Sequence, residues 1–581
     1  MTARSLFHEE KVVGSVLGAA VGDALGWPLE GRARKYTSSV NSNVGRKQEQ
    51  QFLNWTRGGS RFEPYREPIA AGEYSDDTQL LLSTARSILH GHDWWERFAF
   101  VELPFWQMYE RGGGGATKRA AQSWLSGKPP WKSSQTRGKY LDAGGNGVAM
   151  RILPHVLAAE KGSEGQDIAK QIVMNGISTH GHPRALVGAL LHGMTLWLSL
   201  RQEEMLEFGA LTHAVSRDFP KWAQMPEPLV SWRDAFSDSE FSDYKIAWEN
   251  TVGECMELID LAAEGLRLGP LSAGPETLHK MGALNAKTNG SGTITAAASL
   301  FLASRYAAAP LQGLMVAASA KGADTDTVAS MCGSILGAIH GDEWLGHFAD
   351  SVQDALYLQK VAKRLVDKAG NFIDPNVFRV TKRDWENFRK RLHILTVGAD
   401  VTLPDGRPAV LRRVEPMFSE SAQADLCIFE TEDGQTLAVK RVVRKRKAPI
   451  VPPDLPSSEI LRVGIKIFVS DLALAKDFYV KKLGLEIAKE YPTGFTVGEV
   501  ISVHLANSHE QQVLSFQPTS LPAPTPYIRV ASIDVFASRL CAVGLAVNEV
   551  ADHRSVKRIR FSDPFGNQLE FFEARQGNGG P

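Results

Sequence analysis

Cysteine is scarce in this chain, with four residues among 581 and no CxxC pair. Cys255, Cys332, Cys427 and Cys541 lie far apart, which argues against a disulfide framework and against a thiolate metal site. An excess of charge is also missing, because Lys+Arg and Asp+Glu each number 65. The overall basic surface of a typical nucleic-acid binder is therefore not expected.

Long hydrophobic runs are missing as well. The most apolar stretches, such as Thr293 to Ser304, fall short of the ~20 residues that cross a bilayer. The first residues carry acids where a signal peptide needs an apolar segment. We therefore expect a soluble, cytoplasmic protein without a membrane partner. A chain of this length is expected to form two to four domains.

Residues 1–350 are expected to form one domain, in which residues 10 to about 350 show helical periodicity. Examples are Val13, Val16, Leu17, Ala20 and Ala24. Two rows of glycines recur at spacings of four, Gly14-Gly18-Gly22 and Gly333-Gly337-Gly341. Because glycine weakens a helix, such rows indicate two helices packed backbone against backbone. Polar, Gly- or Pro-containing stretches at 36–72, 126–146 and 218–245 favour long loops.

The pattern changes after a helical connector at 351–395. Two Asp-Gly turns between strand-like runs predict a small β-barrel-like module at 396–450. Prolines at 451–458 indicate a semi-rigid linker. Residues 459–575 repeat a pattern of strand, helix and strands, which predicts an α+β domain with internal duplication.

Two short clusters of acids stand at predicted helix starts. Ser75-Asp76-Asp77-Thr78 and Asp324-Thr325-Asp326-Thr327 each supply two carboxylates and hydroxyls within four residues. Either cluster alone is explained by helix capping and by favourable charge at the helix N-terminus. Together they offer the oxygen ligands that Mg²⁺ and Mn²⁺ prefer. Asp324 and Asp326 would point to one side if the backbone between them is extended.

Five motifs in order resemble the ADP-ribosylglycohydrolases, an all-helical family that includes the dinitrogenase-reductase-activating enzyme. They cover about 330 residues. In chain order they are Gly18-Ala-Ala-Val-Gly-Asp-Ala-Leu-Gly-Trp-Pro-Leu-Glu30, Ser75-Asp-Asp-Thr78, Gly145-Asn-Gly-Val-Ala-Met-Arg151, Ser178-Thr-His180 and Gly322-Ala-Asp-Thr-Asp-Thr327.

The resemblance implies a site with two divalent cations, Mg²⁺ or Mn²⁺. Their ligands would be Ser75, Asp76, Asp77, Asp324, Asp326 and Thr327, and Glu30 would gate or join the site. Either Asp77 or Glu30 would act as the catalytic base. The loop from Gly112 to Thr117 would cradle a diphosphate, because glycines let backbone N–H groups approach anionic oxygens. ADP-ribose would be bound by Gly113, Gly114, Gly115, Gly145, Asn146, Gly147 and His180. Some relatives place an aromatic before the Gly-Asn-Gly to stack on adenine, and Gly144 stands there instead.

Residues 459–574 resemble the vicinal-oxygen-chelate family, which includes glyoxalase I and bleomycin-resistance proteins. The resemblance rests on Val469-Ser-Asp-Leu, Phe478-Tyr-Val-Lys-Lys-Leu-Gly-Leu and Phe561-Ser-Asp-Pro-Phe-Gly-Asn-Gln-Leu-Glu-Phe. It implies paired βαβββ units. Gly464 and Tyr527 occupy two usual ligand positions, which leaves Glu570 and His504 and favours a metal-free binding or dimerisation module.

The sequence thus predicts a multidomain protein with an all-α ADP-ribosylglycohydrolase-like domain, a small β-rich insert and a C-terminal α+β domain. The expected activity is hydrolysis of the glycosidic bond between ADP-ribose and a modified protein, nucleic acid or small molecule. Two alternatives are a non-catalytic ADP-ribose-binding protein and a main activity in the C-terminal domain as a lyase or dioxygenase.

Overall fold

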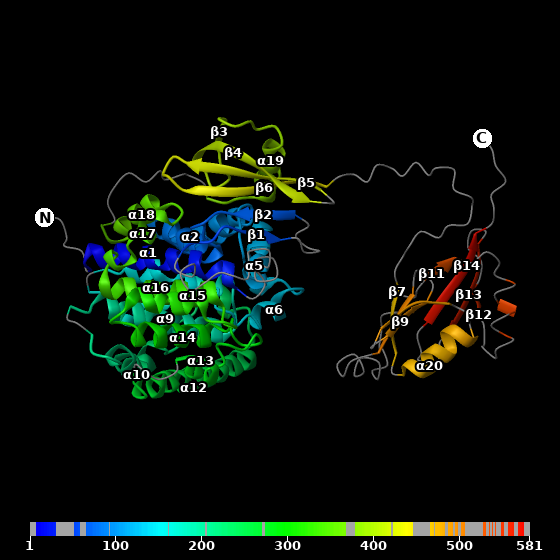
Figure 1. Cartoon of the computed structure of the whole chain (residues 1–581), viewed down its shortest axis with the longest axis horizontal. Coiled ribbons are helices and arrows are strands. Elements are labelled where there is room, and N and C mark those ends of the chain that lie inside the picture. Colours follow the sequence, from blue (N-terminus) through cyan, green and yellow to red (C-terminus); the bar gives the residue numbers. More distant parts are fainter. Residues whose placement is uncertain are drawn as a thin grey trace. The chain divides into compact units, whose positions relative to one another are not determined.

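The computed structural model divides into two compact units, Met1–Arg446 and Lys447–Pro581 (Figure 1). The structure describes the following residues: 7–30, 51–58, 65–91, 93–160, 162–203, 206–269, 274–367, 378–419, 422–444, 465–469, 471–482, 486–491, 494–497, 501–505, 527–529, 534, 537–538, 541, 548–550, 556–562 and 568–574.

The first unit is mainly helical, as predicted. Its helices in the first half are α1 (Glu9–Gly26), α2 (Asp76–His90), α3 (Trp94–Arg97), α4 (Leu103–Trp106), α5 (Gly115–Leu125), α6 (Arg137–Leu141), α7 (Leu153–Leu157), α8 (Gly165–Ile177) and α9 (Pro183–Leu200). The later ones are α10 (Ala210–Trp222), α11 (Val230–Arg233), α12 (Asp238–Arg267), α13 (Gly274–Lys280), α14 (Gly292–Arg305), α15 (Pro310–Ser319), α16 (Thr325–His340), α17 (His347–Ser351), α18 (Ala355–Asp367) and α19 (Lys382–Leu392). The predicted loops at 126–146 and 218–245 thus contain α6, α11 and the start of α12.

Helices α1 and α16 pack backbone against backbone along their glycine rows. A Cβ atom built on Gly18 would lie 2.2 Å from the carbonyl oxygen of Gly333, and one on Gly337 would lie 2.0 Å from that of Gly14. Only glycine tolerates this separation. The prediction of a tight helix pair is confirmed, and the partners are the two glycine rows themselves.

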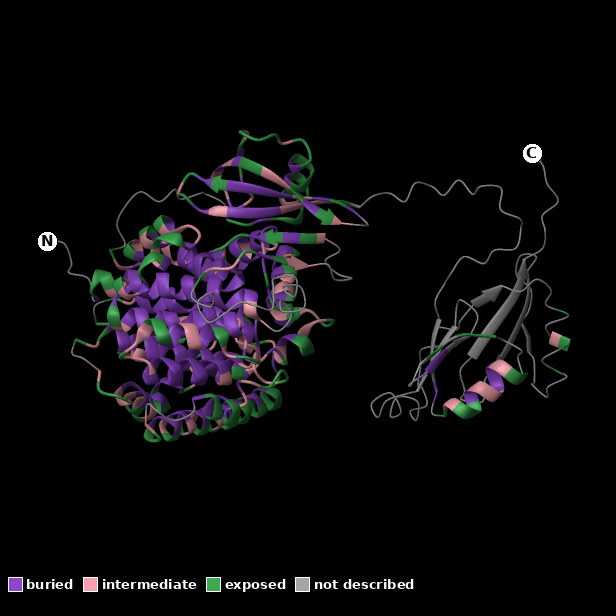
Figure 2. Ribbon diagram, in the orientation of Figure 1, coloured by how far each residue is buried: buried purple, intermediate pink, exposed green. Residues whose placement is uncertain are grey.

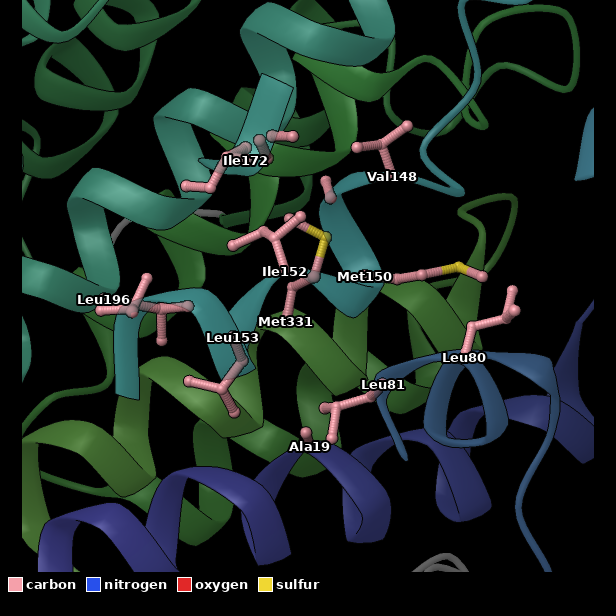
Figure 3. Close-up of a cluster of buried hydrophobic side chains, with 14 of the residues drawn as sticks. Ala19, Leu80, Leu81, Val148, Met150, Ile152, Leu153, Ile172, Leu196 and Met331 are labelled. Carbon is pink, nitrogen blue, oxygen red and sulfur yellow. The ribbon is translucent and has the colours of Figure 1, made fainter. Parts of the chain in front are cut away.

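The apolar faces of these helices meet in one core at the centre of the bundle (Figure 2). Ala19 of α1, Leu80 and Leu81 of α2, and Met331 of α16 converge on the segment that contains Met150 and Ile152 (Figure 3). The segments that carry the predicted site motifs are therefore fixed by burial of their own apolar neighbours.

One segment, Glu9–Leu29, is long and apolar enough to cross a membrane by length and composition. Its apolar window is 94% buried inside the unit. The segment comprises α1 and the short 3₁₀ turn η1 (Trp27–Leu29), and in this structure it is a core helix.

An antiparallel sheet packs beside the helices. Its strands are β1 (Trp55–Gly58), β2 (Tyr65–Ile69), β3 (Asp400–Thr402), β4 (Pro408–Ser419), β5 (Ala422–Thr431) and β6 (Thr436–Arg444). The order is β1-β2-β4-β5-β6, with β3 on β4. Tyr65 pairs with Ser419, so the sheet joins the start of the chain to residues 400–444.

This sheet corrects the prediction of a long loop at 36–72, because β1 and β2 lie inside that stretch. The β-rich residues predicted at 396–450 belong to the same compact unit as the helices up to Arg446. Short strands such as β2 have too few residues for a clear alternating pattern. They become strands by pairing with a distant partner.

The described residues of the second unit form two four-stranded sheets. The first has the order β7-β10-β9-β8, and α20 (Leu472–Lys476) follows β7 in the chain. The second has the order β11-β14-β13-β12. Their bounds are β7 (Ile465–Val469), β8 (Ile487–Tyr491), β9 (Gly494–Val497), β10 (Ile501–Leu505), β11 (Tyr527–Arg529), β12 (Asn548–Val550), β13 (Val556–Ser562) and β14 (Gln568–Ala574).

This arrangement agrees with the predicted pair of βαβββ units. His504 lies on β10 and Glu570 on β14, where Glu570 pairs with Tyr527. Gly464 and the predicted linker at 451–458 lie outside the described residues.

Candidate active site

Both acid clusters stand at helix starts, as predicted. Helix α2 begins at Asp76, and the Ser75 hydroxyl accepts a hydrogen bond from the Asp77 backbone N–H at 3.3 Å. Helix α16 begins at Thr325, directly after Asp324. The expectation of an extended backbone across Asp324–Asp326 is wrong, because Asp326 lies in the first turn of α16.

A carboxylate on a third helix holds the start of α2. Asp23 of α1 is fully buried and accepts hydrogen bonds from the backbone N–H groups of Ser75 and Thr78, each at 3.0 Å. The Thr78 hydroxyl donates to the same side chain at 2.6 Å. Asp23 therefore caps α2 from outside and fixes it relative to α1.

The two clusters meet in space. The Thr327 hydroxyl donates to Asp77 Oδ1 at 3.4 Å across 250 positions of sequence. The Thr325 hydroxyl donates to the carbonyl of Gly26 at 2.8 Å, which joins the start of α16 to the end of α1. The glycine-lined α1–α16 contact thus brings Asp326 and Thr327 towards the end of α2 that bears Asp76 and Asp77.

The carboxylates of these acids repel one another and raise one another's pKa. Burial raises the pKa of Asp77, and the carboxylates of Asp23, Asp76 and Asp324 raise it further. Burial likewise raises the pKa of Asp326, and Glu30 is the carboxylate that adds most to that shift. The half-buried Glu30 also raises the pKa of Asp76. The predicted ligands and Glu30 therefore form one interacting acidic cluster.

The donor chemistry of this cluster fits divalent cations. Asp77 Oδ2 is buried without a hydrogen-bond partner, and buried carboxylates normally have one. Within the described residues, no group of three or more His, Cys, Asp or Glu side chains is arranged to hold a metal ion. Mg²⁺ commonly takes one or two carboxylates and keeps several waters, so the hydroxyls of Ser75 and Thr327 and water would complete its shell.

The glycine-rich loop lies against the acids. Gly112 has φ +101°, and a Cβ built on it would lie 2.7 Å from Asp76 Oδ1. Gly113 is buried and donates its N–H to Glu110 Oε2 at 3.1 Å. Gly114 is the N-cap of α5, provides no side-chain cap, and is exposed like Gly115. The Gly113 N–H is thus engaged within the loop, and the N–H groups of Gly114 and Gly115 lie at the exposed start of α5.

Asn146 connects the second predicted binding loop to the acids. Its Nδ2 donates to Asp324 Oδ2 at 3.0 Å, and its backbone N–H donates to the carbonyl of Gly290 at 2.9 Å. Gly145 forms an isolated bridge with Ser291. A cavity of about 420 Å³ opens beside Gly144 and Gly145. Asn146 therefore lies where it can orient Asp324.

His180 faces the same loop. Its ring lies beside Gly147, whose added Cβ would come within 3.2 Å of Cε1. Nδ1 contacts the Thr179 hydroxyl at 2.7 Å, and Arg151 Nη2 donates to that hydroxyl at 2.9 Å. Burial and the charge of Arg151 lower the pKa of His180 to about 3. The imidazole is thus neutral near pH 7 and can form hydrogen bonds without carrying charge.

Residues 4–372 match the family model of the ADP-ribosylglycohydrolases, which is more than half of the chain. The chain belongs to the ADP-ribosylglycohydrolase family. Residues 460–571 match the model of the glyoxalase, bleomycin-resistance protein and dioxygenase superfamily. The family supports a glycohydrolase activity for the first unit.

Among solved structures, an ADP-ribosylglycohydrolase-related protein complex is similar at 22% identity and a TM-score of 0.39, with 62% of this chain and 99% of the other covered. A putative glyoxalase family protein from Bacillus anthracis is 23% identical with a TM-score of 0.17, over 21% of this chain and all of the other. TnmS3, an antibiotic-binding protein from Streptomyces sp. CB03234, is 26% identical with a TM-score of 0.16, and the match covers 20% of this chain and 99% of the other. A search of curated proteins found no match.

Sequence reasoning missed two acids of this ADP-ribosylglycohydrolase site. Asp23 is the one charged residue of α1 after its first turn, and that isolation was a usable signal of a buried role. Glu110 raises the pKa of Asp76 more than any other neighbouring charge does. Nothing local marks Glu110, because its proximity to Asp76 depends on the fold.

Proposed function

We propose that the first unit is a divalent-metal-dependent hydrolase that cleaves the glycosidic bond between ADP-ribose and a modified acceptor. The observation that carries the proposal is the convergence of the buried Asp76, Asp77 and Asp326 with the half-buried Glu30 and Asp324 beside a glycine-rich loop. Buried acids that raise one another's pKa are costly for folding, and function is a sufficient reason to keep them.

Ser75, Asp76, Asp77, Asp324, Asp326 and Thr327 would hold two cations, Mg²⁺ or Mn²⁺. Bound there, such cations supply a water of lowered pKa and polarise the oxygens that they contact. Asn146 orients Asp324, and Asp23 keeps α2 in register with α1. The N–H groups of Gly114 and Gly115, at the start of α5, would serve the diphosphate, because the Gly113 N–H already donates to Glu110. The neutral His180 lies beside Gly145 and Gly147, where it would contact the nucleoside.

A carboxylate must take the proton from the attacking water as the glycosidic bond breaks through an oxocarbenium-like transition state. Asp77 is 2% exposed and crowded by three other carboxylates. Glu30 is half-buried at the end of η1 and interacts with Asp76 and Asp326. Glu30 is the better base because it can return the proton to solvent.

The alternative of a protein that binds ADP-ribose without cleaving it is less favoured. Such a protein needs the glycine-rich loop and Asn146 but gains nothing from a cluster of mutually repelling acids. A main activity in the second unit would require metal ligands beyond Glu570 and His504, and the usual ligand positions hold Gly464 and Tyr527 instead.

The test is release of ADP-ribose from a panel of arginine-linked, serine-linked, nucleic-acid-linked and O-acetyl substrates. Release from one class, its loss in EDTA and its recovery with Mg²⁺ or Mn²⁺ are expected. Asp324→Ala with Asp326→Ala should abolish turnover while the fold persists.

Asp260→Ala with Glu264→Ala, which removes two exposed acids from α12, is the charge-matched control and should leave activity unchanged. Full turnover by the Asp324/Asp326 double variant would refute the proposal.

A further inference from the structure

Strand β6 lies outside the residues that match the family model, yet it contacts the site from two directions. Lys440 on β6 donates from Nζ to the carbonyl of Glu110 at 2.7 Å and pairs with Glu67 at 3.3 Å. The Lys440 side chain is 11% exposed and Glu67 is fully buried. A hydrogen bond from a charged donor in such a setting is among the stronger ones in a protein.

The segment that Lys440 contacts at Glu110 continues directly into the glycine-rich loop beside Asp76. Glu110 precedes Gly112 by two positions, and Gly112 abuts Asp76. The Glu110 carboxylate accepts from Gly113 N–H at 3.1 Å, and the Arg111 N–H donates to Gln79 of α2 at 3.2 Å. A shift at the Glu110 carbonyl would therefore move the glycine-rich loop relative to Asp76.

The other end of β6 braces the residue before Ser75. The Thr436 N–H donates to Asp354 Oδ2 at 3.0 Å, and the Tyr74 hydroxyl donates to the same oxygen at 2.7 Å. Among the described residues, Asp354 is the one non-glycine with positive φ, at 58°. Such a backbone is tolerated where surrounding contacts hold it. Arg86 on α2 also donates to Gln435, just before β6, at 2.9 Å.

Lys440 also balances charge at this point. Glu67 is fully buried and Glu110 is partly buried, and Arg111, Arg57 and Lys118 are the other cations beside them. Without Lys440, the Glu110 carbonyl would lose its charged donor, and the negative charge beside the glycine-rich loop would be less compensated.

We propose that β6 is a positioning element of the active site, and that Lys440 holds the glycine-rich loop in place for the diphosphate of ADP-ribose. This inference rests on the proposed function for the identity of the ligand. It makes the sheet at 400–444 part of the catalytic unit.

The experiment compares the full chain with its Lys440→Met variant. Hydrogen exchange of peptides covering 109–118 should accelerate in the variant, because the loop loses an anchor. Affinity for free ADP-ribose, measured by calorimetry, should fall about tenfold, the effect expected for one charged hydrogen bond. In turnover, KM should rise more than kcat falls.

Two further variants separate positioning from general damage. Lys363→Met removes an exposed lysine that pairs with Glu9 and should leave exchange and affinity unchanged. Lys440→Arg keeps a cationic donor and should recover most of the affinity. If Lys440→Met does not fold, Lys440→Gln, which keeps a neutral donor, takes its place.

Unchanged exchange at 109–118 would overturn the inference, and so would faster exchange with unchanged ADP-ribose affinity. If the unmodified protein binds no ADP-ribose, the proposed function fails. The exchange result still decides in that case whether Lys440 anchors the loop.

Discussion

Buried acids set the character of the site at the scale of single residues. Asp23 satisfies its carboxylate with three donors from the start of α2, whereas Asp77 keeps one buried oxygen without a partner. Aspartate therefore has two different roles in this site. One acid fixes geometry, and the other leaves its charge available to a ligand.

Divalent cations should stabilise the protein in a manner that depends on pH. Raised pKa values at Asp76, Asp77 and Asp326 mean that the folded state binds more protons than the unfolded state above about pH 4. Their contribution to stability therefore declines as pH rises, and a bound cation removes that cost. The rise in Tm with Mg²⁺ or Mn²⁺ should grow from pH 5 to pH 8 in calorimetric scans.

The Asp324→Ala, Asp326→Ala double variant should lose most of that rise in Tm. An equal rise in the double variant would mean that the cations bind elsewhere.

Glu67 should make stability depend on pH in the opposite direction. Burial alone would raise its pKa, but Lys440, Arg111 and Arg57 more than offset burial and lower it to about 2. Its stabilising effect is thus complete above the unfolded value of 4.5 and is lost as pH falls towards 2. Glu67→Gln should reduce the free energy of unfolding at pH 7 by about 3 kcal/mol, measured by urea denaturation.

The difference between Glu67→Gln and the unmodified protein should shrink below pH 4.5. A difference that stays constant from pH 7 to pH 3 would show that packing, not charge, accounts for the loss.

At the scale of elements, the α1–α16 pair connects the stability of the fold to the geometry of the site. α1 carries Asp23 and α16 carries Asp326 and Thr327, so their separation sets how the acids meet. Gly22 and Gly26 continue the close contact to the start of α16, where an added Cβ would lie 2.2 Å from the carbonyl oxygens of Ala329 and Thr325.

Gly18→Ala should separate the two helices and reduce stability by about 1–3 kcal/mol, the usual cost of overpacking. Activity should fall as well, because Asp326 would move relative to Asp77. Gly253→Ala on α12 is the matched control. Nothing lies within 4 Å of its added Cβ, so it should stabilise by about 0.5–1 kcal/mol. Chemical denaturation of both variants tests this, and equal effects would contradict it.

The strands show where sequence patterns stop being informative. The glycine rows and the acid pairs at helix starts are local signals, and both were predicted. β2 has five residues, and it pairs with β4 about 350 positions later. Such a short strand is stabilised by its distant partner and has no clear local pattern. The stretch at 36–72 was therefore predicted as a loop.

At the scale of the whole molecule, the boundary of the first unit should be Arg446 rather than the end of the family match at 372. A fragment of residues 1–446 should melt cooperatively and keep its activity. A fragment of residues 1–372 should be markedly less stable, because Arg86, Asp354 and Glu67 would lose their contacts with Gln435, Thr436 and Lys440. Calorimetry should give a lower Tm for fragment 1–372 than for fragment 1–446, and equal Tm values would contradict the expectation.

The sequence by itself determined the helix starts with their acid pairs, the close helix pair and the two families, because each depends on short-range spacing or on an ordered set of motifs. The tertiary structure decided which acids share one cluster, that Asp23 and Glu110 belong with them, and that β6 reaches the glycine-rich loop. Those facts depend on contacts between residues up to several hundred positions apart, and no local pattern encodes such contacts.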